Sequence, residues 1–214
     1  MPEQGTAKER PARVNDDTYI SEFLSDMENV LRRLPREPLS RAIDALFQAW
    51  RNSRTVFIAG NGGSASTASH FACDLTKWTA SPGKKRFKVI ALTDNMPLYS
   101  ALVNDEGPAS VYAEQLEPFA ASGDVLILIS VHGGAGEGNA GAWSQNLLRA
   151  LQLAASRGVQ TIGLSGFDGG ALKQMADICI VVPIDSTPHV ESCHVAIEHL
   201  ICDRLRQRIS QEGE

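Results

Sequence analysis

Two segments that lie far apart in the chain carry histidines and carboxylates at helical spacing. The first, Val56 to Leu75, reads VFIAGNGGSASTASHFACDL and contains His70 and Asp74, four residues apart. Residues four apart share one face of a helix, so this imidazole and this carboxylate are expected to project together. The second segment, near the C-terminus, contains Glu191, His194, Glu198 and His199.

Helical geometry divides the C-terminal set. Glu191 and His199 lie about 80° apart around the helix axis, on one broad face, whereas His194 and His199 diverge by roughly 140°. Glu198 is expected to face solvent or an arginine, and His189 and His194 are expected at the surface or an interface. If the two segments meet, two imidazoles and two carboxylates converge. Such a set suits Zn²⁺ or a similar divalent ion.

A histidine and a carboxylate on one helix face are most often a solvated pair, and the sequence before His70 argues for more than that. An apolar run ends there in the glycine turn Gly60 to Ser64, which reads GNGGS. Glycines let the backbone approach a ligand closely, and the N–H groups that open a helix attract anions. The turn therefore predicts a cradle for a phosphate or a sugar phosphate.

The elements that position these residues follow a regular alternation of short apolar runs and helical stretches. Short runs rich in Val and Ile between helices predict a parallel sheet buried on both faces, in a doubly wound, three-layer α/β/α sandwich. Ligands of such sheets bind outside the carboxyl ends of the strands, where the polar loops of this chain lie. The five predicted strands are Thr55 to Ala59, Phe87 to Leu92, Asp124 to Ser130, Gln160 to Ser165 and Ile178 to Val182.

Two amphipathic helices are expected before the first strand. Residues 1–15 are polar and predict a flexible tail, and residues 16–214 predict a single domain. The first helix should begin at Asp16 or Asp17 as the N-cap and stop at Pro35. Its apolar face predicts either an oligomer interface or packing against the domain's own sheet.

Composition excludes several classes of protein. The net charge of -5 provides no basic surface for nucleic acid. No apolar run approaches the ~20 residues that span a bilayer, and the N-terminus lacks the apolar core of a signal peptide, so a cytoplasmic protein without membrane contact is expected. The four cysteines have no CxxC spacing and are expected to be reduced, packed thiols; they are Cys73, Cys179, Cys193 and Cys202.

A resemblance extends from about residue 17 to the C-terminus. The strings GNGGSASTASHFACDL, LTDN, GDVLILIS, GLSGFDGG and TPHVESCHVAIEHLI, with ND at Asn104 and Asp105, resemble the sugar isomerase (SIS) domain of the phosphoheptose isomerase group. The resemblance implies a homotetramer with active sites between subunits. It also implies interconversion of sedoheptulose 7-phosphate and a D-glycero-D-heptose 7-phosphate, the first step toward nucleotide-activated heptoses.

The resemblance also implies roles for individual residues. Asp74 and His199 fall at the catalytic positions, which selects His199 over His194. Zinc, one ion per subunit, would be bound by His70, Asp74, Glu191 and His199. Substrate contacts are implied for Asn61, Gly62, Gly63, Ser64, Asp94, Asn104, Asp105, Ser130, His132, Ser144 and Glu191.

The chain departs from the family pattern at three places. Asp74 replaces a longer glutamate, and Glu191 replaces a glutamine that many members carry, which adds negative charge to an ion site. The hydroxyl-rich phosphate loop here reads SVHGGA from Ser130, and an insertion runs from Gly133 to Trp143. Glycine-rich backbone can still form an anion nest, and Ser144 either caps the next helix or also contacts phosphate.

Three functions remain open from the sequence. The first is an aldose–ketose isomerase that acts through a cis-enediol, with Asp74 as the base and His199 as its acid partner. The second is a non-catalytic SIS module that binds a sugar phosphate or a protein partner for regulation. The third is an isomerase of another phosphosugar, which the altered loop would select.

Overall fold

The computed structural model describes residues 15–134 and 144–213 of the 214-residue chain. Contacts within the chain divide it into two units, residues 1–33 and 34–214, which are described separately. The predicted tail falls, apart from Asn15, outside the described residues, and so does most of the predicted insertion. Among the described residues, no helix combines the length and apolarity needed to cross a bilayer.

The first unit contains helix α1, Asp16–Arg32. Its N-cap is Asn15, whose side chain accepts a hydrogen bond from the backbone N–H of Asp17 at 3.1 Å. The expectation that Asp16 or Asp17 caps this helix was therefore wrong. Both aspartates lie in the first turn, where their charges favour the positive end of the helix dipole.

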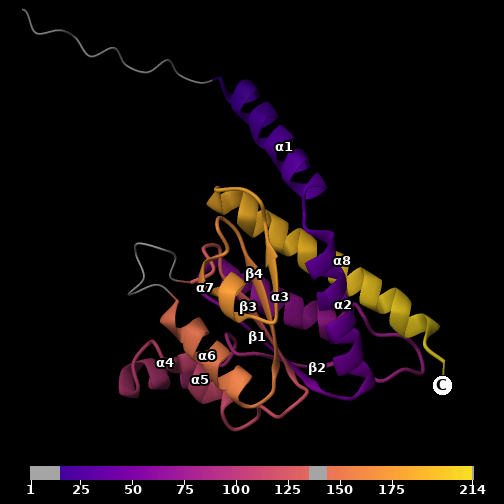
Figure 1. The fold of residues 1–214 in the computed structure, drawn as a ribbon, viewed down its shortest axis with the longest axis vertical. Helices are drawn as coiled ribbons and strands as arrows, with labels where there is room; N and C mark the ends of the chain where they lie inside the picture. Colours follow the sequence, from indigo (N-terminus) through magenta and orange to yellow (C-terminus); the bar gives the residue numbers. More distant parts are fainter. Residues whose placement is uncertain (1–14, 135–143, 214) are drawn as a thin grey trace, which may run out of the picture. The chain divides into compact units, whose positions relative to one another are not determined.

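The second unit is built on a five-stranded sheet in the order β2-β1-β3-β4-β5, in which every pair of neighbours is parallel (Figure 1). The predicted doubly wound sheet is thus confirmed, and its strands agree with the predicted ranges to within one residue at each end. Its elements are α2 Arg36–Arg51, β1 Thr55–Gly60, α3 Gly63–Lys77, β2 Lys88–Ala91, α4 Met96–Asp105, α5 Val111–Leu116, β3 Val125–Ile129, α6 Gln145–Ser156, β4 Gln160–Ser165, α7 Gly170–Met175, β5 Ile178–Val181 and α8 Thr187–Gln211.

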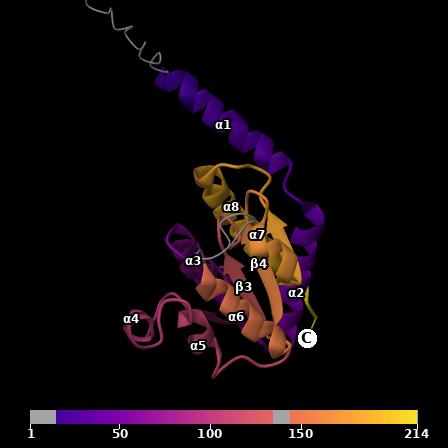
Figure 2. The same cartoon turned by 60° about the vertical axis from the view of Figure 1, so that its left-hand side comes forward.

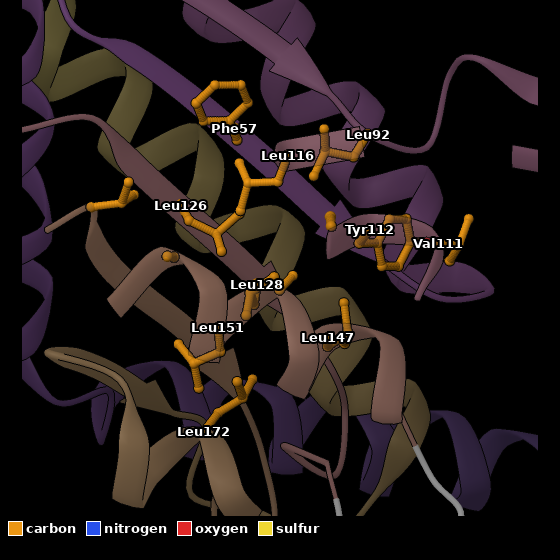
Figure 3. Close-up of a cluster of buried hydrophobic side chains, with 14 residues drawn as sticks. Phe57, Leu92, Val111, Tyr112, Leu116, Leu126, Leu128, Leu147, Leu151 and Leu172 are labelled. Carbon is orange, nitrogen blue, oxygen red and sulfur yellow. The ribbon is translucent and has the colours of Figure 1, made fainter. Parts of the chain in front are cut away.

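Helices cover both faces of this sheet (Figures 1 and 2). On one face α5, α6 and α7 pack over the strands, and Figure 3 shows Phe57, Leu126 and Leu128 buried beneath them. Because side chains alternate along a strand, Val56 and Ile58 point to the opposite face, which α2, α3 and α8 cover. The result is the predicted three-layer sandwich.

Burial differs between the centre and the edge of the sheet. Every residue of β3 is buried, whereas residues of β2 are half-buried or exposed, and Ile90 is 38% exposed. The prediction that all strands are buried on both faces was therefore wrong for β2. The four cysteines form no disulfide, and Cys193 and Cys202 are packed as expected, but Cys73 is exposed.

The amino ends of the strands are tied together by two carboxylates. Asp124 accepts hydrogen bonds from the backbone N–H groups of Thr55 at 2.9 Å and Ala121 at 3.0 Å. Asp177 accepts from the backbone N–H and the hydroxyl of Thr161, both at 2.8 Å. These bonds fix the amino ends of the strands. Such sheets bind ligands at the carboxyl ends of the strands, at the point where the strand order reverses, which is here between β1 and β3.

Candidate functional site

The glycine turn joins β1 to α3 at the carboxyl edge of the sheet. Gly62 has φ +56° and ψ -125°, a conformation that side chains rarely adopt. A Cβ atom at Gly60 would lie 2.4 Å from the carbonyl oxygen of Ser64, so glycine is needed there for the helix to begin so close to the strand. The turn thus presents the start of α3 directly above the end of β1.

A pocket of about 150 Å³ lies between this turn and the end of β3. It brings together six of the eleven residues for which substrate contacts were implied, from the turn, the loop after β3, the start of α6 and α8. Gly62 and Gly63 form the turn beside it. The pocket is lined by Asn61, Ser64, Ile129, Ser130, Val131, His132, Gly134, Ser144 and Glu191.

Two asparagines hold the two sides of this pocket together. Asn61 donates to the side-chain oxygen of Asn146 at 3.0 Å, and Asn146 donates back to that of Asn61 at 2.9 Å. The hydroxyl of Tyr112 donates to the carbonyl of Gly60, and burial raises the pKa of this phenol. The glycine turn is therefore fixed to the first turn of α6 and to α5.

Ser144 stands at the N-cap position of α6 with φ 58°, a left-handed conformation. Within the described residues its hydroxyl makes no capping hydrogen bond, and the residue lines the pocket. The expected capping by the hydroxyl of Ser144 was therefore wrong for the described residues, and its contact with phosphate stays a prediction.

Three residues with implied substrate contacts lie outside the pocket lining. Asp94 accepts hydrogen bonds from Ser69 and Thr93 and lines a separate hollow along α3 and β2. Asn104 and Asp105 are exposed at the end of α4, where the Asn104 amide donates to the Asp105 carboxylate at 2.6 Å. In the single chain these side chains contact each other or the scaffold.

Helices α3 and α8 pack side by side and run in the same direction, as two pairs of contacts show. Near their N-termini, a Cβ atom at Gly63 would lie 2.4 Å from Oε1 of Glu191. Seven residues further along each helix, His70 approaches Glu198. Seven residues bring a helix back to within about 20° of the same face and advance it by about 10 Å. Glu191 and Glu198 therefore both face α3, at two different levels.

Four potential ligand atoms converge at the level of His70 and Glu198, all within 4.8 Å of one another. They come from His70, Asp74, Glu198 and His199. The Nε2 atom of His199 lies 3.7 Å from Oδ2 of Asp74 and 3.8 Å from Oε1 of Glu198. His70 approaches Asp74 through Nε2 at 3.9 Å and Glu198 through Nδ1 at 2.8 Å. The predicted meeting of two imidazoles and two carboxylates thus occurs, with Glu198 in the position expected for Glu191.

Glu198 is fully buried, so the expectation that it faces solvent or an arginine was wrong. Burial, and then the nearby charge of Asp74, raise the pKa of this carboxyl to about 8. The signal that could have identified Glu198 is its helical spacing, because it lies four residues before Cys202 and seven before Leu205, which are buried residues of α8. A carboxylate on the buried face of a helix needs a hydrogen-bond donor or a cation beside it.

His189 and His194 are also buried, which contradicts their expected place at the surface or an interface. The Nε2 atom of His194 lies 3.2 Å from the carbonyl oxygen of Ser165, and desolvation lowers the pKa of this imidazole to about 4. His189 contacts the hydroxyl of Ser186 through Nδ1 at 2.7 Å. The contact of His194 joins α8 to the end of β4, the contact of His189 lies within the start of α8, and neither side chain belongs to the group around Asp74.

Comparison with known proteins identifies the family. The model of the SIS domain matches residues 18–166, more than half of the chain. The chain belongs to the SIS domain family. Within it, the chain is 35% identical over 193 residues to the phosphoheptose isomerase of Aliarcobacter butzleri, with 89% of this chain and 97% of the relative covered. It is an isomerase of the phosphoheptose isomerase group.

A second relative of this SIS protein carries a different name. The lincomycin biosynthesis protein LmbN of Streptomyces lincolnensis is 40% identical over 201 residues, which cover 92% of this chain and 70% of LmbN. Among solved structures, the phosphoheptose isomerase of Neisseria gonorrhoeae superposes with a TM-score of 0.79 at 26% identity, covering 90% of this chain and 100% of the other. The SIS fold and the group are therefore supported by sequence and by structure.

The lowered pKa of His194 predicts a loss of stability in acid. The unfolded chain binds a proton near pH 6.5 and the folded chain near pH 4, so the free energy of unfolding should fall by about 2 kcal/mol between pH 7 and pH 5 through this group. His194→Gln keeps a donor for Ser165 but does not titrate. Urea unfolding at both pH values should show a smaller fall for the variant, and equal falls would contradict the assignment.

Proposed function

We propose that the chain isomerises sedoheptulose 7-phosphate to a D-glycero-D-heptose 7-phosphate through a cis-enediol, the first step toward nucleotide-activated heptoses. The observation that carries this proposal is the pairing of Asp74 and His199, 3.7 Å apart, on the two helices that also frame the pocket. Moving a carbonyl between C1 and C2 needs a base for a carbon-bound proton and an acid for an oxygen. A carboxylate and an imidazole at this distance can serve one substrate together.

The steps follow from these two side chains. Asp74 removes a proton from C1, the electron pair forms the C1–C2 double bond, and His199 protonates the oxygen on C2 to complete the enediol. His199 then takes the proton of the oxygen on C1 as that carbonyl forms, and Asp74 returns its proton to C2. Each group ends the cycle in its starting protonation state, so no external acid or base is consumed.

A divalent ion, proposed to be Zn²⁺ at one per subunit, fits the group around Asp74. Two imidazoles and two carboxylates are donors that Zn²⁺ accepts, and one ligand atom from each lies within 4.8 Å of the other three. Tetrahedral zinc separates its ligand atoms by about 3.4 Å. Such an ion would polarise the substrate oxygens as a Lewis acid. His70, Asp74 and His199 are the ligands on which the resemblance and this geometry agree.

The two ends of the substrate are proposed to lie at the two sides of the pocket. Asn61 and Ser64 would hold the sugar, and Ser130, His132 and Ser144 would hold the phosphate. The loop after β3 supplies a histidine and glycine N–H groups where hydroxyls are lost, and both can bind an anion. This division is supported by the placement of all five residues around one pocket.

A homotetramer with active sites between subunits is proposed from the resemblance. The side chains of His70 and His199 are 46% and 52% exposed in the single chain. Electrostatic interactions with an ion or a developing charge are stronger where water is excluded. A neighbouring subunit that covers these imidazoles would therefore favour the reaction. On α1, the exposed apolar side chains Tyr19, Ile20 and Leu24 offer a surface for such contacts.

One observation favours a second candidate, an isomerase of another phosphosugar. Val131 and His132 stand in the phosphate loop where the family pattern has hydroxyls, and both line the pocket. The relative named for lincomycin biosynthesis is also more similar in sequence than the phosphoheptose isomerase of A. butzleri. The chemistry at Asp74 and His199 would be the same, and the length or position of the phosphate-bearing chain would differ.

The acid–base roles predict proton exchange with solvent. With sedoheptulose 7-phosphate in D₂O, deuterium should enter C1 or C2, followed by NMR, and Asp74→Asn and His199→Ala should each slow this by roughly 10²- to 10⁴-fold. Asp203→Asn, an exposed carboxylate one turn further along α8, is the matched control and should exchange at the wild-type rate. A wild-type protein that binds sugar phosphate without exchange would instead be the non-catalytic module.

The altered phosphate loop predicts a gain of affinity when a hydroxyl is restored. Val131→Thr keeps the shape of the side chain and adds a donor to the pocket, so KM for sedoheptulose 7-phosphate should fall by roughly tenfold with little change in kcat. Steady-state kinetics with ketose phosphates of different chain length provide the comparison. A higher kcat/KM for another ketose phosphate, and a KM that the substitution leaves unchanged, would favour the second candidate.

The proposed assembly predicts a mass in solution of four times the 23.1 kDa of one chain, measured by light scattering. Leu24→Arg places a charge among the exposed apolar side chains of α1 and should lower this mass. Ser25→Arg introduces the same side chain at an exposed position on the opposite side of the helix and should leave the mass unchanged. A wild-type monomer would remove the proposal of active sites between subunits.

A further inference from the structure

Glu198 is a buried carboxyl group that the proposed reaction does not use. Its side chain has no exposed surface, and neither carboxylate oxygen has a hydrogen-bond partner among the described residues. A buried carboxylate without hydrogen bonds is strongly destabilising unless a charge compensates it. The structure therefore contains a cost in free energy that the protein side chains around Glu198 do not offset.

The contact with His70 does not remove this cost. Nδ1 of His70 lies only 2.8 Å from Oε1 of Glu198, yet the pair lacks the alignment of a hydrogen bond. If Glu198 served only to orient the imidazole, its oxygen would lie along the N–H direction. Ligand atoms that point at a common ion approach one another closely without such alignment. Short distance with poor alignment is thus the geometry expected of two ligands of one metal ion.

Charge supports the same conclusion. Asp74 and Glu198 place two carboxylates within 4.8 Å of two imidazoles, and the side chain of Glu198 is fully buried while that of Asp74 is 20% exposed. Two like charges at this distance repel each other, and one divalent cation neutralises both. The Nε2 atom of His199, at 3.7 and 3.8 Å from the two carboxylates, completes a set of four donors around one centre.

Glu191, the other glutamate on this face of α8, lies at a different level. It contacts the position of Gly63, seven residues before His70, and it lines the substrate pocket. Seven residues correspond to about 10 Å along the helix, more than an extended glutamate side chain covers. The two glutamates therefore have separate partners, one beside the substrate and one beside the imidazoles.

We infer that in this chain Glu198 binds the divalent ion directly, together with His70, Asp74 and His199, and that Glu191 faces the substrate instead. The inference rests on the ion of the proposed function. The fourth ligand is then Glu198, which lies seven residues after Glu191 on the same face of α8, and not Glu191 as the family resemblance implies.

Metal binding by full-length protein, without any turnover, tests the inference. Chelator-treated wild-type protein is titrated with Co²⁺, whose visible absorption reports coordination geometry, and then with competing Zn²⁺. We expect one ion per chain. Glu198→Met, which removes both donor oxygens, should weaken Zn²⁺ binding by at least roughly 100-fold, the upper range for loss of an outer partner, and should change the Co²⁺ spectrum.

Two comparisons keep the outcome independent of folding. Metal-free Glu198→Met should melt at or above the temperature of the metal-free wild type, because an uncompensated buried carboxyl has been replaced by an apolar side chain. Glu191→Met, which removes the donor oxygens of the other glutamate, should bind Zn²⁺ within about threefold of wild type. The inference is overturned if the wild type binds no ion, if Glu198→Met keeps wild-type affinity and spectrum, or if Glu191→Met loses the ion instead.

The inference and the proposed function fail in different measurements. Deuterium exchange by the wild type, together with unchanged metal binding in Glu198→Met, would reject the inference and leave the isomerase standing. Loss of the ion in Glu198→Met, together with absence of exchange in the wild type, would reject the isomerase and leave the metal site standing.

Discussion

The parallel packing of α3 against α8 is the constraint on which the site depends. At the first turns of the two helices, Gly63 leaves room for the carboxylate of Glu191, because a Cβ atom there would lie 2.4 Å from Oε1 of Glu191. The same register then brings His70 to Glu198 one heptad later. One packing arrangement therefore fixes the positions of the Glu191 carboxylate and of the four potential ligand atoms. A shift of either helix along its axis would separate Gly63 from Glu191 and the ligand atoms of one helix from those of the other.

The sheet supplies the other half of the site. Strand order reverses between β1 and β3, so the loops that follow these strands diverge to opposite faces and leave a crevice between them. Asp124 and Asp177 fix the amino ends of four strands through backbone N–H groups. The amino ends of the strands are thus held in place, and the loops that line the pocket lie at the carboxyl ends.

The sequence predicted the sheet well because continuous apolar runs between helices have few alternative structures. It also predicted that His70, Asp74 and His199 meet, since turn chemistry and family resemblance agreed there. Spacing within α8 puts Glu198 among the packing residues, but the general tendency of glutamate to face solvent led to the wrong expectation. Asp94, Asn104 and Asp105 are polar residues in and beside a surface helix, and sequence contains no signal for whether such side chains reach a pocket formed by other elements.

The paired amides of Asn61 and Asn146 have a consequence for how the protein responds to pH. Both side chains are neutral at all physiological pH values, and each donates one hydrogen bond and accepts one. Histidine and carboxylate side chains can change charge with pH, but the link between the glycine turn and α6 contains no titrating group. Its geometry should therefore be independent of pH, and salt, which screens ion pairs, leaves this link intact as well.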